Sequence, residues 1–84
     1  MTPTPEPEAA LQTLARQLQQ FADARDWGPF HSPKNLASAL VVEAGELLEH
    51  FQWLTEHQSR QLAPEHKQAV AHEMADVLLY LVQL

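Results

Sequence analysis

Apolar residues recur at intervals of three and four positions in three separate stretches of the chain, with polar residues between them. This spacing is typical of amphipathic α-helices, which turn once every 3.6 residues. It predicts helices over about 8–25, 33–55 and 64–84. Residues 56–63 lack a clear period and are expected to form a connection that can hold one helical turn. No strand pattern stands out, so the sequence predicts an all-α fold, a helical bundle of antiparallel helices.

Proline marks the helix boundaries. Ser32-Pro33 is typical of an N-cap followed by a first helical residue, and Pro64 begins the third helix in the same way. Gly28-Pro29 is a helix stop and a loop signal. Residues 1–7 hold three of the six prolines and are expected to form a disordered tail, which leaves 8–84 as the helical domain.

The third helix has no stop signal. No glycine, asparagine or terminal cation closes it before Leu84, the last residue. We therefore expect this helix to continue beyond Leu84 and the 84 residues to represent a chain truncated at the C-terminus.

Length and composition exclude several classes of protein. A chain of 84 residues forms one domain at most, and its core is small enough that a bound ligand or oligomerisation is expected. The absence of cysteine excludes disulfides, thiolate catalysis and cysteine zinc sites. No apolar run reaches transmembrane length, and the N-terminus lacks the basic and apolar regions of a signal peptide. We expect a cytoplasmic protein that does not bind membranes.

The acidic charge of the chain is concentrated in two helices. The net charge is −6, and without five particular acids it would be −1. These acids are Glu43, Glu46, Glu49, Glu73 and Asp76. A local cluster of this kind argues against a general acidic tail, and it argues against binding to a nucleic-acid polymer, which needs a basic surface.

Two pairs of these acids are spaced for a cation site. Glu43 and Glu46 lie three residues apart on one apolar helix, and Glu73 and Asp76 do so on the next, which brings the members of each pair side by side. If the two helices pack antiparallel, four carboxylates converge. Carboxylates resist burial unless a positive charge compensates them, and sites made only of oxygen ligands prefer Mg²⁺, Mn²⁺ or Ca²⁺. Solvated surface charge is the alternative interpretation.

A di-iron bundle would require Glu-x-x-His on two helices, and no glutamate here has a histidine three residues later. Four further histidines show no ligand pattern and are interpreted as surface or boundary residues. They are His50, His57, His66 and His72.

Trp27, Phe30 and His31 lie within five residues of one another in the predicted loop. They either plug the end of a small bundle or form a stacking surface for a flat ligand, and the two roles are compatible. Gly45 lies inside the second helix, where it either permits close approach of another helix or ligand or is simply tolerated.

Three motifs together resemble a known family. They are Arg25-Asp-Trp-Gly-x-Phe-His-x-Pro-Lys-Asn-Leu36, Glu43-x-x-Glu-Leu-x-Glu-x-Phe-Gln-Trp53 and Glu73-Met-Ala-Asp-Val-Leu-Leu-Tyr-Leu81. In this combination the chain resembles the MazG-like all-α nucleoside triphosphate pyrophosphohydrolases, and most closely their dCTP pyrophosphatase branch. The resemblance covers about residues 18–84.

The resemblance implies hydrolysis of a nucleoside triphosphate, dCTP or a related pyrimidine nucleotide, to the monophosphate and pyrophosphate, with a role in removing non-standard nucleotides. It implies Mg²⁺, or Mn²⁺ in its place, held by Glu43, Glu46, Glu73 and Asp76. Glu46 or Glu43 would orient or deprotonate the attacking water. The implied base pocket lies near Trp27, His31, Trp53 and Tyr80.

The family forms dimers, or tetramers built from dimers, in which a neighbouring subunit contributes part of the site. Its members also continue beyond the position of Leu84 and add a fourth helix, which this sequence lacks. Lys34 is either a phosphate contact or a solvated lysine. Two alternatives to an enzyme stay open: a catalytically incomplete helical module for nucleotide binding or assembly, and a structural helical oligomer with solvated acids.

Overall fold

The computed structural model describes residues 6–84, and this range contains helices and no strand. The helices are α1 (Pro7–Ala24), the short 3₁₀ helix η1 (Gly28–Phe30), α2 (Pro33–Glu49), α3 (Glu56–Ser59) and α4 (Pro64–Gln83). The all-α prediction with three long helices is confirmed. Residues 1–5 of the predicted tail lie outside the described residues, and its last residue, Pro7, is the first residue of α1.

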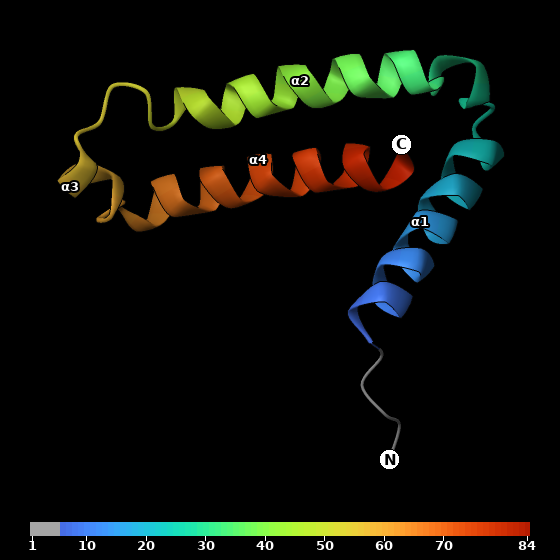
Figure 1. Ribbon diagram of the computed structural model, residues 1–84, viewed down its shortest axis with the longest axis horizontal. Helices are drawn as coiled ribbons and strands as arrows, with labels where there is room; N and C mark the ends of the chain where they lie inside the picture. The colour runs from blue at the N-terminus through green and yellow to red at the C-terminus, as the bar shows by residue number, and fades with distance from the viewer. Residues whose placement is uncertain (1–5) are drawn as a thin grey trace.

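The centre of the fold is an antiparallel hairpin of α2 and α4, with α1 lying obliquely across the C-terminal end of α4 (Figure 1). Leu36 from α2, Val70 from α4 and Ala22 from α1 are the buried apolar residues of this packing. The antiparallel arrangement brings the middle of α2, where one acidic pair lies, alongside the middle of α4, where the other lies.

Side-chain caps fix the starts of two helices. The Ser32 hydroxyl accepts a hydrogen bond from the backbone N–H of Asn35 at 3.2 Å, which confirms the predicted N-cap before α2. Thr55 and Gln58 form a capping box at α3, in which each side chain accepts a hydrogen bond from the other residue's backbone N–H. The helical turn foreseen in the 56–63 connection is therefore present.

The second helix ends earlier than the sequence predicts, at Glu49 and not near residue 55. The N–H of Phe51 donates to the carbonyl of Leu48, and the chain then tightens into turns. Thr55 must be extended to cap α3, and its ψ of 165° cannot continue a helix. His50 and Phe51 lie in this turn against His66 of α4, with ring centroids 5.3 and 6.4 Å from the His66 ring.

A single chain is more extended than a compact protein of the same length. Its radius of gyration is 15.9 Å, against about 12 Å for a compact chain of this size. Several side chains that the sequence places on core-facing stripes are half exposed, among them Leu11 at 47%, Met74 at 56% and Leu81 at 54%. The helical period identified the apolar faces correctly, but within one chain the three helices cover them only in part.

Within residues 6–84, the helices are all too short or too polar to cross a lipid bilayer. The cytoplasmic location expected from the sequence stays a prediction.

Gly45 faces open space, since a Cβ added at this position would meet nothing within 4 Å. We expect Gly45→Ala to raise the free energy of unfolding by about 1 kcal/mol, because alanine restricts the unfolded chain and favours the helix. Urea denaturation followed by circular dichroism measures this, with Ala71→Gly on the exposed face of α4 as the reverse control. A loss of stability in Gly45→Ala would mean that another chain packs against this position.

Candidate active site

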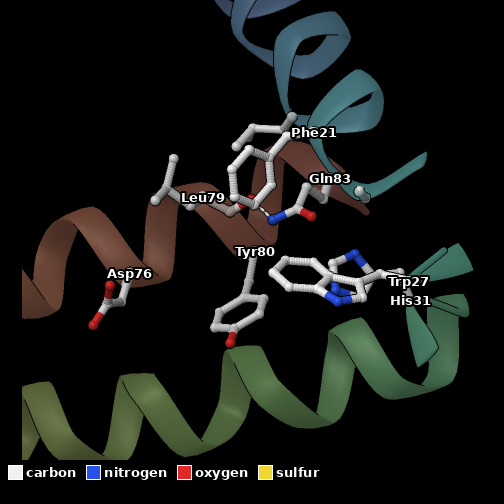
Figure 2. Close-up of a pocket in the computed structure, with 9 residues that line it drawn as sticks. Phe21, Trp27, His31, Asp76, Leu79, Tyr80 and Gln83 are labelled. Carbon is white, nitrogen blue, oxygen red and sulfur yellow. Dashed lines mark hydrogen bonds between the residues drawn. The ribbon is translucent and has the colours of Figure 1, made fainter. Parts of the chain in front are cut away.

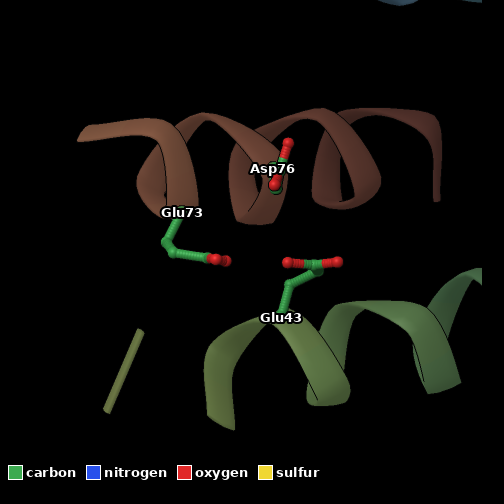
Figure 3. A group of neighbouring side chains, drawn as sticks. All are labelled: Glu43, Glu73 and Asp76. Carbon is green, nitrogen blue, oxygen red and sulfur yellow. The ribbon is translucent and has the colours of Figure 1, made fainter. Parts of the chain in front are cut away.

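Three carboxylates gather in the space between α2 and α4. Glu43 reaches from α2, and Glu73 and Asp76 reach from α4, with one oxygen of each lying within 4.8 Å of the others (Figure 3). The two helices that carry them run in opposite directions, so residues 30 positions apart in the chain meet at the same level. The predicted convergence of the two acidic pairs is therefore visible for three of the four acids.

The cluster carries uncompensated negative charge. One carboxylate oxygen of Glu43 and one of Glu73 are shielded from solvent and have no hydrogen-bond partner among residues 6–84. The neighbouring Glu73 carboxylate is the main cause that raises the pKa of Glu43, followed by partial burial. Buried carboxylate oxygens without a donor are the ligands that a hard divalent cation needs, so these residues fit such a cation.

Glu46, the fourth predicted ligand, lies one turn after Glu43 on the same helix and outside the tight group of three. It still belongs to the same electrostatic environment, because the Glu43 carboxylate raises the pKa of Glu46. Its carboxylate is thus next to the three converging acids without being one of them. Glu49, one turn further on, is exposed.

The raised pKa of Glu43 predicts how stability changes with pH. In the folded protein this pKa lies above its ordinary value of 4.5, so the group's stabilising contribution is fully present below pH 4.5 and is lost as the pH rises through the raised pKa. We therefore expect the Tm of the metal-free protein to fall across this window.

Thermal melts in EDTA between pH 4.5 and 7 measure this fall, and Mg²⁺ at pH 7 should reverse it. Glu43→Gln should flatten this part of the profile, whereas Glu65→Gln, on an exposed turn of α4, should not. If the Tm of Glu43→Gln falls by the same amount over this pH range, groups other than Glu43 cause the fall.

A pocket of about 190 Å³ lies beside the cluster, where α1 and the loop after it meet the end of α4 (Figure 2). Its apolar wall consists of Leu18, Phe21, Ala22, Trp27 and Leu79. Its polar side chains are His31, Asp76, Tyr80 and Gln83. The predicted base-pocket residues Trp27, His31 and Tyr80 are therefore brought together.

Aromatic contacts hold Trp27 in place. Its ring meets Phe21 edge-on at a centroid distance of 5.4 Å and lies 5.6 Å from the tilted ring of His31. The Arg25 guanidinium covers Phe21, 3.5 Å from the ring centroid. Trp27 itself remains 39% exposed, so part of its surface is available to a ligand in the pocket. The contacts of Trp27 agree with the interpretation of this loop as a plug, although Phe30 is 71% exposed. The stacking surface for a flat ligand stays a prediction.

Asp76 connects the two parts of the site. It contributes an oxygen to the acidic cluster and also lines the aromatic pocket. Tyr80 follows one turn later on the same face of α4, and its hydroxyl points toward α2 (Figure 2). A ligand with an anionic part and a flat ring part would find a cation site and a ring pocket directly next to each other.

Two predicted residues are not brought to the pocket of a single chain. Trp53 is 86% exposed in the turn after α2, whereas Trp27 precedes α2. The 17 residues of that helix span about 25 Å at 1.5 Å per residue. Lys34 is exposed in the first turn of α2 and does not line the pocket. Their predicted contacts with substrate stay predictions.

Phe21, Leu79 and Gln83 line the pocket, although the sequence analysis did not propose them as site residues. Leu79 and Gln83 follow Asp76 by three and seven positions, the spacing of residues on one helical face, so this signal was present in the sequence. Phe21 lies on the apolar face of the first helix, where the pattern alone indicates a core residue. Its role in the pocket depends on how α1 crosses α4.

Comparison with known proteins gives relatives of one kind. The chain is 45% identical to human dCTP pyrophosphatase 1 and 46% identical to the Mus musculus protein of that name, each over 80 residues that make up 93% of this chain. It spans 47% of each of these relatives, about half their length. A scan against protein-family models finds no match.

Among solved structures, the chain is similar to a pyrophosphatase from Archaeoglobus fulgidus, with a TM-score of 0.82 and 35% identity. That alignment covers the whole of this chain and 76% of the archaeal one. The fold, the sequence identity over most of a solved relative and the three motifs therefore all indicate a pyrophosphatase family. The chain belongs to the MazG-like all-α nucleoside triphosphate pyrophosphohydrolases, and the relatives that it matches over about half their length are dCTP pyrophosphatases.

Proposed function

We propose that the protein is a Mg²⁺-dependent pyrophosphohydrolase that converts dCTP, or a related pyrimidine nucleotide, to the monophosphate and pyrophosphate. The observation that carries this proposal is the position of Asp76, which belongs both to the acidic cluster and to the wall of the aromatic pocket. The names of the relatives support the nucleotide class.

The acidic cluster would hold the ion. Glu43, Glu73 and Asp76 are the ligands, and the orphaned oxygens of the two glutamates favour a cation between the helices. Bound Mg²⁺ would supply positive charge to the triphosphate and to the pyrophosphate that leaves. Since Mg²⁺ keeps few protein ligands and completes its shell with phosphate oxygens and water, three carboxylates leave room for substrate.

Glu46 is the group that we assign to the attacking water. It lies one turn after Glu43, next to the ligand cluster and outside the group of three that would hold the ion, so its carboxylate is available to accept a proton from a water near the ion. The water oxygen would bond to the α-phosphorus, its proton would pass to Glu46, and the bond from that phosphorus to the bridging oxygen would break. Glu43 is the second candidate for this role.

The aromatic pocket would hold the base. Trp27 offers a partly exposed indole face, and Tyr80 and His31 lie around the same volume. Stacking of a base on an aromatic side chain contributes about 1–3 kcal/mol, enough to orient the nucleotide with its phosphates toward the acids.

We also propose that the protein acts as a homo-oligomer, a dimer or a tetramer built from dimers. An apolar groove between α2 and α4, lined by Leu47, Leu48, Phe51, Val70 and Met74 among others, is open to solvent in one chain. A second copy covering such a groove would bury these side chains, and it could bring Trp53 or Lys34 to a neighbouring site.

A nucleotide panel with product identification tests the function. The protein is incubated with Mg²⁺ and each deoxynucleoside and ribonucleoside triphosphate, and the products are separated by anion exchange. We expect monophosphate and pyrophosphate, with dCTP among the best substrates. Release of inorganic phosphate and a nucleoside diphosphate would instead show cleavage between the β and γ phosphates. Tight dCTP binding without any product would favour the alternative, a catalytically incomplete binding or assembly module.

A further inference from the structure

We propose that Gln83 determines base selectivity by accepting a hydrogen bond from the exocyclic amino group of the base, so that the pocket prefers an amino-bearing pyrimidine to its oxo counterpart. This inference rests on the proposed function and deepens it. Gln83 is the last residue of α4 and lines the aromatic pocket. It lies seven positions after Asp76, on the same helical face.

The orientation of the Gln83 amide is fixed by chemistry. Its Nε2 donates a hydrogen bond of 2.9 Å to the backbone carbonyl of Leu79, one turn back, in a partly buried position. A carbonyl oxygen accepts and cannot donate, so the atom facing it must be the amide nitrogen. The oxygen of the same amide then lies on the side away from that carbonyl (Figure 2). Gln83 therefore presents a fixed acceptor, whereas a freely turning amide would present either group.

The other polar groups of the pocket have different positions or tasks. Asp76 belongs to the acidic cluster, and the Tyr80 hydroxyl points toward α2 (Figure 2). His31 lies against Trp27, with 5.6 Å between the rings. The Gln83 amide oxygen is one uncharged acceptor among the residues that line this largely apolar pocket, and it is the one whose orientation a hydrogen bond fixes.

The aromatic wall and the acceptor together indicate the ligand. The pocket of about 190 Å³ is bordered by Phe21, Trp27 and Tyr80, whose rings offer flat surfaces to a base. Cytosine carries an amino group where uracil carries a carbonyl oxygen. An amino group can donate to Gln83 Oε1, whereas the uracil oxygen would face another acceptor and leave both unpaired. Sites built around a hydrogen bond reject analogues that lack the matching group.

The test compares dCTP with dUTP. The two nucleotides share sugar and phosphates, and cytosine carries an amino group where uracil carries a carbonyl oxygen. We expect kcat/KM to favour dCTP in the wild type. Gln83→Leu, of similar size but without polar atoms, should lower the dCTP-to-dUTP ratio about 10-fold. Gln83→Glu keeps an acceptor but removes the Nε2 donor that fixes the amide on the Leu79 carbonyl, so it should retain only part of the preference. Gln68→Leu, on an exposed position of the same helix, is the control and should leave the ratio unchanged.

Two results would overturn the inference: no preference for dCTP in the wild type, or an unchanged ratio in Gln83→Leu. Circular dichroism confirms that each variant is folded. If no nucleotide yields pyrophosphate, the proposed function fails, and the ratio is then measured as dissociation constants for the two nucleotides with Mg²⁺. The Gln83 inference is thereby tested separately from turnover.

Discussion

Replacing Asp76 with asparagine is expected to slow pyrophosphate release at least 100-fold and to leave the helices intact. The substitution keeps the size of the side chain and removes one negative charge from the group of three carboxylates. Removing one group that holds charge in a catalytic site typically costs a factor of about 10²–10³ in rate. The affinity for Mg²⁺ should fall as well, so added Mg²⁺ should raise the Tm of the variant less than that of the wild type.

Steady-state rates across a Mg²⁺ titration measure this loss. Glu46→Gln is the matched comparison, since Glu46 adjoins the cluster without belonging to the group of three. It should lower kcat strongly and leave the Mg²⁺ dependence nearly unchanged. Glu65→Gln, in the exposed first turn of α4, should behave as the wild type. A full rate in Asp76→Asn would remove this residue from the site.

The second large effect is expected from Trp27→Ala, which should raise KM for dCTP by about 10- to 100-fold with a smaller change in kcat. The indole forms part of the pocket wall, and loss of one stacked aromatic ring costs about 1–3 kcal/mol of binding. Trp27→Phe keeps a ring against Phe21 and should recover most of the affinity.

Trp53→Ala provides the informative contrast, because this side chain is 86% exposed and lies outside the pocket of its own chain. If a neighbouring subunit supplies Trp53 to the pocket, the variant should also raise KM, and the effect should grow as dilution separates the subunits. An unchanged KM in both tryptophan variants would show that base binding occurs elsewhere.

The helices and the meeting of the acids could be predicted because each depends on local spacing. The period of 3.6 residues identified the three long helices, and the prolines at positions 33 and 64 marked their starts. When the two helices that carry the acidic pairs pack antiparallel, the pairs lie at the same height along the helix axes. The end of α2 was predicted wrongly because its apolar period continues through Phe51 and Leu54, while the cap of α3 requires an extended Thr55.

The pocket could be predicted only in part, because it forms between segments whose relative placement is set by tertiary packing. Phe21 and Gln83 meet only where α1 crosses α4. A sequence pattern assigns an apolar residue such as Phe21 to the core and a polar residue such as Gln83 to the surface. Neither assignment reveals that the residue lines a cavity. Trp53 shows the opposite case, since its motif predicts a site residue that one chain leaves at the far end of α2.

One consequence follows from the single straight helix that carries Asp76, Tyr80 and Gln83. With a rise of 1.5 Å per residue, Asp76 and Gln83 are separated along the axis by about 10.5 Å, and no hinge lies between them. In the proposed function, helix α4 would therefore set the distance between the phosphate end and the base end of a bound nucleotide. One residue inserted between Tyr80 and Gln83 would turn Gln83 by about 100° and should abolish base selection while the acidic cluster stays intact.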